Sequence, residues 1–290
     1  MIGFWLVNLI VPNDPSSFVI KTPAGKWSLL KSTNFDKLKP DIENGACGNT
    51  YSIEFNGLDN SMTSTDAAFE EMVPICLAAS FLTGMAVTVR QSTAHSKMQI
   101  FQTGPHFPRD RGILGPNFCI NNIDEFIEFV EKFVKNYLVL NATEKLRLMM
   151  HFFIDAQSCW SLENLYLSGS TILQIISSTE EDSGRGEAKK HAKTRGNDNP
   201  SFYDYLAGAA QKLSITPLQH DVIKIRNSLI HEGTLSNHNF INQHDAALPI
   251  TEAMAWIDEY IFMLINQKPV PRKRYASSSM VYRINSFSFD

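Results

Sequence analysis

The chain has 290 residues, of which 43% are hydrophobic and 19% are charged, and its formal net charge is −4 at pH 7. This composition excludes an intrinsically disordered chain, and the length is enough for two domains that each bury a core. The slightly negative charge excludes a uniformly basic nucleic-acid-binding protein, so any surface for RNA must be a local basic patch.

The cysteine usage and the lack of long apolar runs predict a cytoplasmic protein. The cysteines are widely spaced and form no C-x-x-C pair, which favours a reducing compartment; they are Cys47, Cys76, Cys119 and Cys159. The first eleven residues, MIGFWLVNLIV, lack the basic start and the cleavage site of a signal peptide, so we expect a buried strand there. No later run reaches the roughly 18 apolar residues that span a membrane.

Residues 1–120 carry the pattern of a β-rich domain. Turn clusters separate short segments rich in β-branched or aromatic residues: WLVNLIV, SFVIKT, WSLLKS, TYSIEF, MAVTVRQ and KMQIFQ. One helix is expected from about Asp66 to Leu82, with a kink at Pro74. The stretch 104–116 is predicted to be a linker or long loop. A sandwich-like arrangement and an α+β arrangement both fit this pattern.

From residue 121 onward the pattern becomes helical. Helical periodicity covers 123–139 and 143–178, with a bend expected near Ser168–Ser170, and then about 201–213, 217–231 and 249–267. The polar stretch 180–200 is predicted to be a solvated loop. The fold class is therefore α+β, with a β-rich N-terminal domain at 1–120 and an all-α domain at 121–290.

The helix predicted at 217–231 has clear signals at both ends. Thr216 suits the N-cap, Pro217 the first helical position, and Gln219 completes a capping box, while Gly233 can end the helix in the left-handed conformation. Between these ends, four apolar residues fall within about 60° of one another on a helical wheel and predict the core-facing stripe: Leu218, Val222, Ile225 and Leu229.

The same helix carries polar residues around a second apolar pair. Ile223 and Ile230 lie roughly 120° from the core-facing stripe, with Arg226 on one side of the pair and Asn227 with His231 on the other. Arg226 and His231 diverge by about 140°, so one copy does not bring them together easily. Two copies that cross at Ile223 and Ile230 about a two-fold axis would place them around a shared cleft, which predicts a homodimer.

The segment RNSLIHEG (226–233) resembles the signature of HEPN domains, in which Arg, commonly followed by Asn, precedes His by a few residues. Arg226, Asn227 and His231 match this order and spacing. HEPN domains also carry an acidic residue on an earlier long helix, and SLENLYL (161–167) resembles that helix, with Glu163 at the acidic position. The resemblance covers roughly residues 140–268 and does not extend to the first 120.

The resemblance implies a small helical bundle and often an activity. Many HEPN domains are metal-independent endoribonucleases that act as dimers in toxin–antitoxin and antiviral defence systems. For this chain, that implies an RNA substrate, no cofactor, and an antitoxin or a phage-derived trigger as a further partner. The β-rich domain ahead of it would then sense or regulate, an expectation that rests on architecture alone.

The chemistry of such a nuclease fits these residue types. Without a metal, the ribose 2′-hydroxyl attacks its own phosphate and leaves a 2′,3′-cyclic phosphate. A histidine can act as general base or acid near neutral pH, and a guanidinium can bind the developing charge. The resemblance thus assigns His231 as base or acid, Arg226 as phosphate ligand, Asn227 as the residue that orients either, and Glu163 as the residue that holds Arg226 or His231.

Two basic clusters could guide an RNA backbone, although such runs are most often solvated. The first comprises Arg185, Lys189, Lys190, Lys193 and Arg195, and the second Arg272, Lys273 and Arg274. The histidines at 231, 238 and 244 match no metal-ligand spacing, and we expect no metal site. The alternative to the nuclease is a non-catalytic HEPN protein that binds RNA, a nucleotide or a partner protein.

Overall fold

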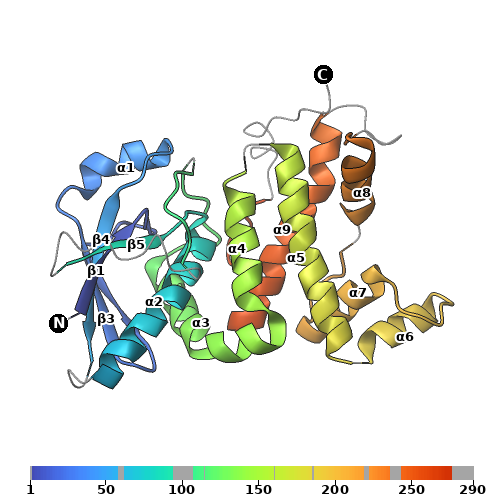
Figure 1. Cartoon of the computed structure of the whole chain (residues 1–290), viewed down its shortest axis with the longest axis horizontal. Coiled ribbons are helices and arrows are strands. Elements are labelled where there is room, and N and C mark those ends of the chain that lie inside the picture. Colours follow the sequence, from blue (N-terminus) through green and yellow to red (C-terminus); the bar gives the residue numbers. More distant parts are fainter. Residues whose placement is uncertain are drawn as a thin grey trace. The chain divides into compact units, whose positions relative to one another are not determined.

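A computed structural model describes residues 2–57, 62–93, 107–113, 115–159, 161–184, 186–218, 222–235 and 243–275 (Figure 1). The chain divides into two compact units, Met1–Asn141 and Ala142–Asp290. The first is built on a β-sheet and the second is helical, so the α+β fold class is confirmed.

The first unit contains a five-stranded antiparallel sheet with the strand order β2-β3-β4-β1-β5. Its strands are β1 (Ile2–Val7), β2 (Ser17–Lys21), β3 (Lys26–Lys31), β4 (Asn49–Asn56) and β5 (Thr88–Ser92). The N-terminal segment is thus a strand, as expected. Because one sheet is packed on helices, the arrangement is α+β and not a sandwich.

One face of this sheet is buried by α2 (Met62–Thr83) and α3 (Ile123–Glu144) (Figure 1). Alternation along the strands sends Trp27 to this face, where it is fully buried. Phe126 of α3 makes an edge contact with Phe18 of β2 at a centroid distance of 5.8 Å, and Phe129 stacks on Phe81 of α2 at 5.4 Å. Most of α3 therefore belongs to the first unit, although its helical pattern predicts a place in the helical domain.

A buried carboxylate ties α2 to the β2–β3 hairpin. Glu71 accepts hydrogen bonds from the backbone N–H of Ala24 at 2.9 Å, the indole N–H of Trp27 at 3.2 Å and the hydroxyl of Thr22. Three donors from the hairpin satisfy the charge without a cation, so this buried acid is structural.

The prediction for the first unit missed one helix. α1 (Phe35–Glu43) buries only Phe35 and Ile42 and contains Pro40, so its pattern is too weak to recognise. Residues 107–113 form no helix or strand, in agreement with the predicted loop, and the predicted strand at 97–102 lies outside the described residues.

The second unit is a helical bundle in which α5 packs against α4, α7, α8 and α9 (Figure 1). Its helices are α4 (Leu146–Gln157), α5 (Leu162–Asp182), α6 (Glu187–Thr194), α7 (Phe202–Leu213), α8 (Val222–Glu232) and α9 (Gln243–Asn266). α5 and α9 approach closely at Gly169, where an added Cβ would lie 2.8 Å from Cδ1 of Ile250. The hydroxyl of Tyr166 donates to the carbonyl of Ala246 at 2.5 Å, which joins the same two helices.

The break in the predicted 143–178 helix lies at 158–161 and not at the expected bend near 168–170. α4 ends at Gln157, and Ser161 begins α5 by accepting a hydrogen bond from the backbone N–H of Asn164 at 3.2 Å. Gly169 instead lies inside a continuous α5, because its missing side chain is needed for packing against α9.

All four cysteines are free thiols. Burial raises the pKa of Cys47 and Cys76, and it raises that of Cys159 to about 12, so few thiolates form near neutral pH. No helix in the described part of the chain is both long and apolar enough to cross a bilayer.

Candidate functional site

α8 carries the RNSLIHEG motif on a helix that is only partly buried. Val222 and Ile225 are buried, whereas Leu229 is half-buried, and α8 packs against α5 and α9. The helix ends where predicted: Gly233 has a φ of +73° and its N–H donates to the carbonyl of Leu229 at 3.1 Å. One face therefore anchors α8 and the other remains open.

The predicted start of this helix is wrong. Residues 215–218 are not helical, and α8 begins at Val222 in the described structure. Thr216 does not cap a helix here; its carbonyl accepts a hydrogen bond from the indole N–H of Trp256 at 2.8 Å. This contact with α9 holds the segment in a non-helical conformation despite the local capping signal. Gln219 lies outside the described residues.

Arg226 and Asn227 are in direct contact. Nη1 of Arg226 donates to Oδ1 of Asn227 at 3.0 Å, and the Nε of Arg226 is buried without a hydrogen bond to any described residue. Asn227 and His231 are exposed, and no hydrogen bond joins them. The Asn227 amide in this single chain is therefore turned to Arg226 and not to His231.

Glu163 lies in the first turn of α5 and is half-buried. Although α5 packs against α8, no hydrogen bond or ion pair joins Glu163 to Arg226 or His231 in the described structure. The role of Glu163 in positioning Arg226 or His231 therefore stays a prediction.

The second apolar pair is the most open part of α8. Ile230 is 47% exposed and Ile223 is half-buried. On the helix, Ile230 shares the exposed side with Asn227 and His231, three residues before and one residue after it. A large aliphatic side chain in this position adds apolar surface directly beside the polar motif.

The stretch 180–200 is not the solvated loop that its composition predicts, because it contains α6. Ala188 and Ala192 are buried and face α7, where an added Cβ on Gly208 would lie 3.0 Å from the backbone N of Ala188. Two alanines and a glycine let the helices approach closely, but they give almost no hydrophobic signal. The opposite side of α6 carries exposed Lys189, Lys190 and Lys193, none of which forms an ion pair with a described residue.

Asp204 holds α6 against α7. It is fully buried at the start of α7, where it accepts hydrogen bonds from the backbone N–H and the hydroxyl of Ser201, both at 2.7 Å. His191 Nδ1 lies 2.7 Å from its other oxygen and Arg195 Nε lies 3.3 Å away, so Arg195 is partly committed to structure. Burial alone would raise the pKa of Asp204, but the hydrogen bonds from Ser201 and His191 and the charge of Arg195 bring it below its ordinary value.

Replacing Asp204 with asparagine is expected to lower the free energy of opening α6 by about 2 kcal/mol at neutral pH. The substitution removes the capping carboxylate and its interactions with His191 and Arg195. Because the pKa of Asp204 is lower in the folded state, its carboxylate stabilises the fold at pH values above the ordinary pKa of 3.8. This stabilisation is lost as the pH falls through the folded-state pKa. Amide hydrogen exchange across α6 should therefore be faster in Asp204→Asn than in wild type at pH 7, and the difference should shrink below about pH 4.

The matched control is Asp198→Asn, which removes an exposed carboxylate from the same α6–α7 connection. Its exchange should match that of wild type at both pH values. Equal exchange in Asp204→Asn and wild type at pH 7 would show that the carboxylate does not hold α6.

The residues of the second predicted basic cluster differ in their exposure to solvent. Arg272 and Lys273 are exposed, but Arg274 is buried and binds Asp258 of α9 through Nε at 2.7 Å and Nη2 at 2.8 Å. Arg274 also lies over the ring of Phe153 at 4.9 Å. The prediction that Arg274 contacts RNA is therefore wrong, because its guanidinium is buried in an ion pair with Asp258. Burial raises the pKa of Asp258, and the guanidinium opposes that rise.

No group of three or more metal-ligating side chains occurs in the part of the chain that the structure describes. His238 and the side chain of His244 lie outside that part. Comparisons with models of protein families, with characterised proteins and with solved structures find no match to this chain.

Proposed function

We propose that this chain is a metal-independent endoribonuclease of the HEPN type, acting as a dimer. The observation that carries the proposal is the Arg226–Asn227–His231 motif on α8, in which Asn227 and His231 are exposed and Arg226 is half-buried, next to the exposed Ile230. The motif matches the HEPN signature, and an exposed histidine and a guanidinium on the same helix offer the base and the phosphate ligand that cleavage through the 2′-hydroxyl needs.

The dimer is part of the proposal because one copy is chemically incomplete. Arg226 hydrogen-bonds Asn227, while His231 has no hydrogen bond to either residue. A second α8 packed on Ile223 and Ile230 would bring the Arg226 of one copy toward the His231 of the other. We propose that Glu163 acts in the assembled site, and that the first unit senses a trigger or restrains the nuclease in a defence or toxin setting.

A direct test incubates wild type, Arg226→Ala and His231→Ala with total cellular RNA in excess EDTA. Wild type should cut and leave 2′,3′-cyclic phosphate ends, because no metal is needed to activate the 2′-hydroxyl, and both variants should be inactive. If wild type does not cut, with or without a divalent metal, the proposal is wrong.

The alternative, a non-catalytic HEPN protein that binds RNA, a nucleotide or a protein, is favoured by one observation. The motif residues of a single copy do not converge, so a monomer has a binding surface on α8 but no assembled catalytic set. RNA binding without cleavage by a chain that remains monomeric would support this alternative.

We further propose that the exposed lysines of α6 contact the RNA backbone. Replacing Lys189, Lys190 and Lys193 with glutamine should weaken RNA binding and reduce the slope of log K against log salt by about 2, because each phosphate contact to single-stranded RNA contributes about 0.7. Filter binding at several salt concentrations measures this slope.

A control variant with the same change in net charge is Lys37→Gln, Lys135→Gln, Lys268→Gln, which removes three exposed lysines elsewhere. It should bind RNA with the slope of wild type. An equal loss in both triple variants would mean that RNA responds to net charge and not to α6.

A further inference from the structure

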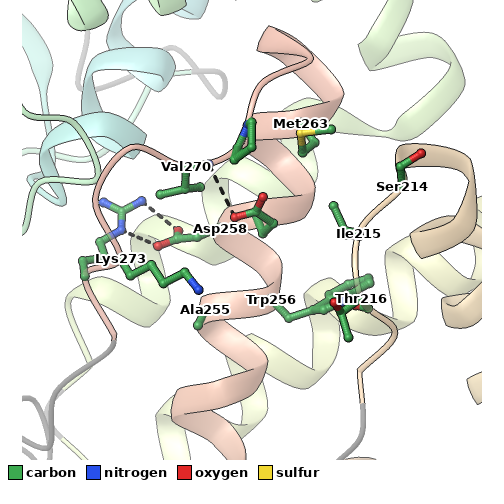
Figure 2. A pocket seen from close by; sticks show the side chains of 12 residues that line it. Ser214, Ile215, Thr216, Ala255, Trp256, Asp258, Met263, Val270 and Lys273 are labelled. Carbon is green, nitrogen blue, oxygen red and sulfur yellow. Dashed lines mark hydrogen bonds and ion pairs between the residues drawn. The ribbon is translucent and has the colours of Figure 1, made fainter.

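The helical unit contains a pocket of about 430 Å³ that is separate from the α8 motif (Figure 2). Three segments distant in sequence line it: 214–216 after α7, 255–263 of α9, and 269–274 after α9. This volume lies in the range of small-molecule sites, which combine apolar walls with a few polar groups.

One wall of the pocket is fixed by the buried Asp258–Arg274 ion pair, drawn with dashed lines in Figure 2. Arg274 makes both its Nε and Nη2 bonds to this carboxylate, and its side chain is fully buried. Because the two charges are paired with each other, this ion pair forms part of the pocket wall, and a charged ligand would have to bind other groups.

Two further charges of opposite sign line the same pocket without pairing with each other. Glu259 accepts a long 3.4 Å hydrogen bond from the backbone N–H of Val270, and Lys273 has no ion-pair partner in the described structure. Figure 2 shows the Lys273 side chain entering from one side, with Thr216 and Trp256 on the opposite side. Within the described structure, the pocket thus presents an anionic group with one long hydrogen bond and a cationic group without an ion-pair partner.

The remaining lining is largely apolar and held in place. Trp256 is buried, stacks on Tyr260 at 5.4 Å and is fixed by its hydrogen bond to Thr216. Ile215 and Met263 extend the same apolar wall. A ligand that fills this space needs an apolar body in addition to its charged groups.

We propose that this pocket binds a zwitterionic small molecule of the amino-acid or dipeptide class. Its ammonium group pairs with Glu259, its carboxylate pairs with Lys273, and its apolar side chains pack against Trp256, Ile215 and Met263. A ligand with a single charge forms a charge-assisted hydrogen bond to only one of Glu259 and Lys273, and it should therefore bind more weakly. This inference is independent of ribonuclease activity.

The test is isothermal titration calorimetry of the full chain with the twenty free amino acids and a set of apolar dipeptides. For the best binder, the N-acetyl and C-terminal amide derivatives each remove one charge, and each should bind wild type at least about 10-fold more weakly. Glu259→Gln should remove the discrimination against the N-acetyl derivative, and Lys273→Gln the discrimination against the amide.

Control variants Glu252→Gln and Lys268→Gln neutralise exposed charges outside the pocket and should retain the wild-type preference for the zwitterion. The proposal is overturned if no amino acid or dipeptide binds wild type at 10 mM or below, or if the derivatives bind as tightly as the parent compound. Because the derivatives are compared on wild type, this result does not depend on how well the variants fold.

Discussion

Replacing His231 with alanine is expected to lower the rate of RNA cleavage by about 10²- to 10⁴-fold, the usual contribution of a general acid or base. The side chain is exposed at the end of α8 and makes no hydrogen bond within the described structure, so its loss removes no packing. The measurement is the single-turnover rate on a fluorescent RNA at saturating protein, which separates chemistry from binding.

The matched control is Glu232→Ala, which truncates the adjacent exposed residue of the same helix. It should cleave RNA at close to the wild-type rate. An equally large loss in Glu232→Ala would mean that the end of α8 had been disturbed. A wild-type rate in His231→Ala would remove histidine from the chemistry and leave α8 as a binding surface.

The sequence predicted the elements that alternate or repeat strongly. In β2 and β3 every second residue is buried, and this period is visible without a structure. Helix α8 and its end at Gly233 followed from the same kind of local rule. These features are decided by residues near one another in the chain.

The missed features depend on residues that are distant in the chain. α6 has only Ala188 and Ala192 on its buried face, and it needs Gly208 of α7 and the buried Asp204 to be held in place. The non-helical conformation at Thr216 is held by a hydrogen bond from Trp256, forty residues later. Composition alone predicts a loop in the first case and a helix cap in the second.

In the candidate site, too, some features follow from nearby residues of the chain and others do not. Spacing on a helix placed Ile230 away from the core-facing stripe, and its side chain is 47% exposed. The Arg226–Asn227 hydrogen bond depends on side-chain conformation, which the helical spacing does not determine. The pocket beside Trp256 could not be predicted, because its lining comes from three segments with no shared motif.

Replacing Ile230 with aspartate is expected to dissociate the proposed dimer and abolish cleavage. Each dimer would bury two new charges in place of two apolar side chains, which costs at least about 3 kcal/mol and raises the dissociation constant more than 10²-fold. Sedimentation velocity at several protein concentrations measures this change. The monomer itself should remain folded, because Ile230 is 47% exposed within one chain.

The matched control is Leu148→Asp, which changes a leucine of nearly the same exposure, 46%, on α4. It should leave the dimer and the activity intact. Mixing inactive Arg226→Ala and His231→Ala chains gives the sharper result: activity returns only if Arg226 of one copy works with His231 of the other. Recovery in this mixture, and its loss when both chains also carry Ile230→Asp, would establish that the site is shared between two copies. A monomeric wild type that cleaves RNA would contradict the shared site while leaving the chemistry of His231 in place.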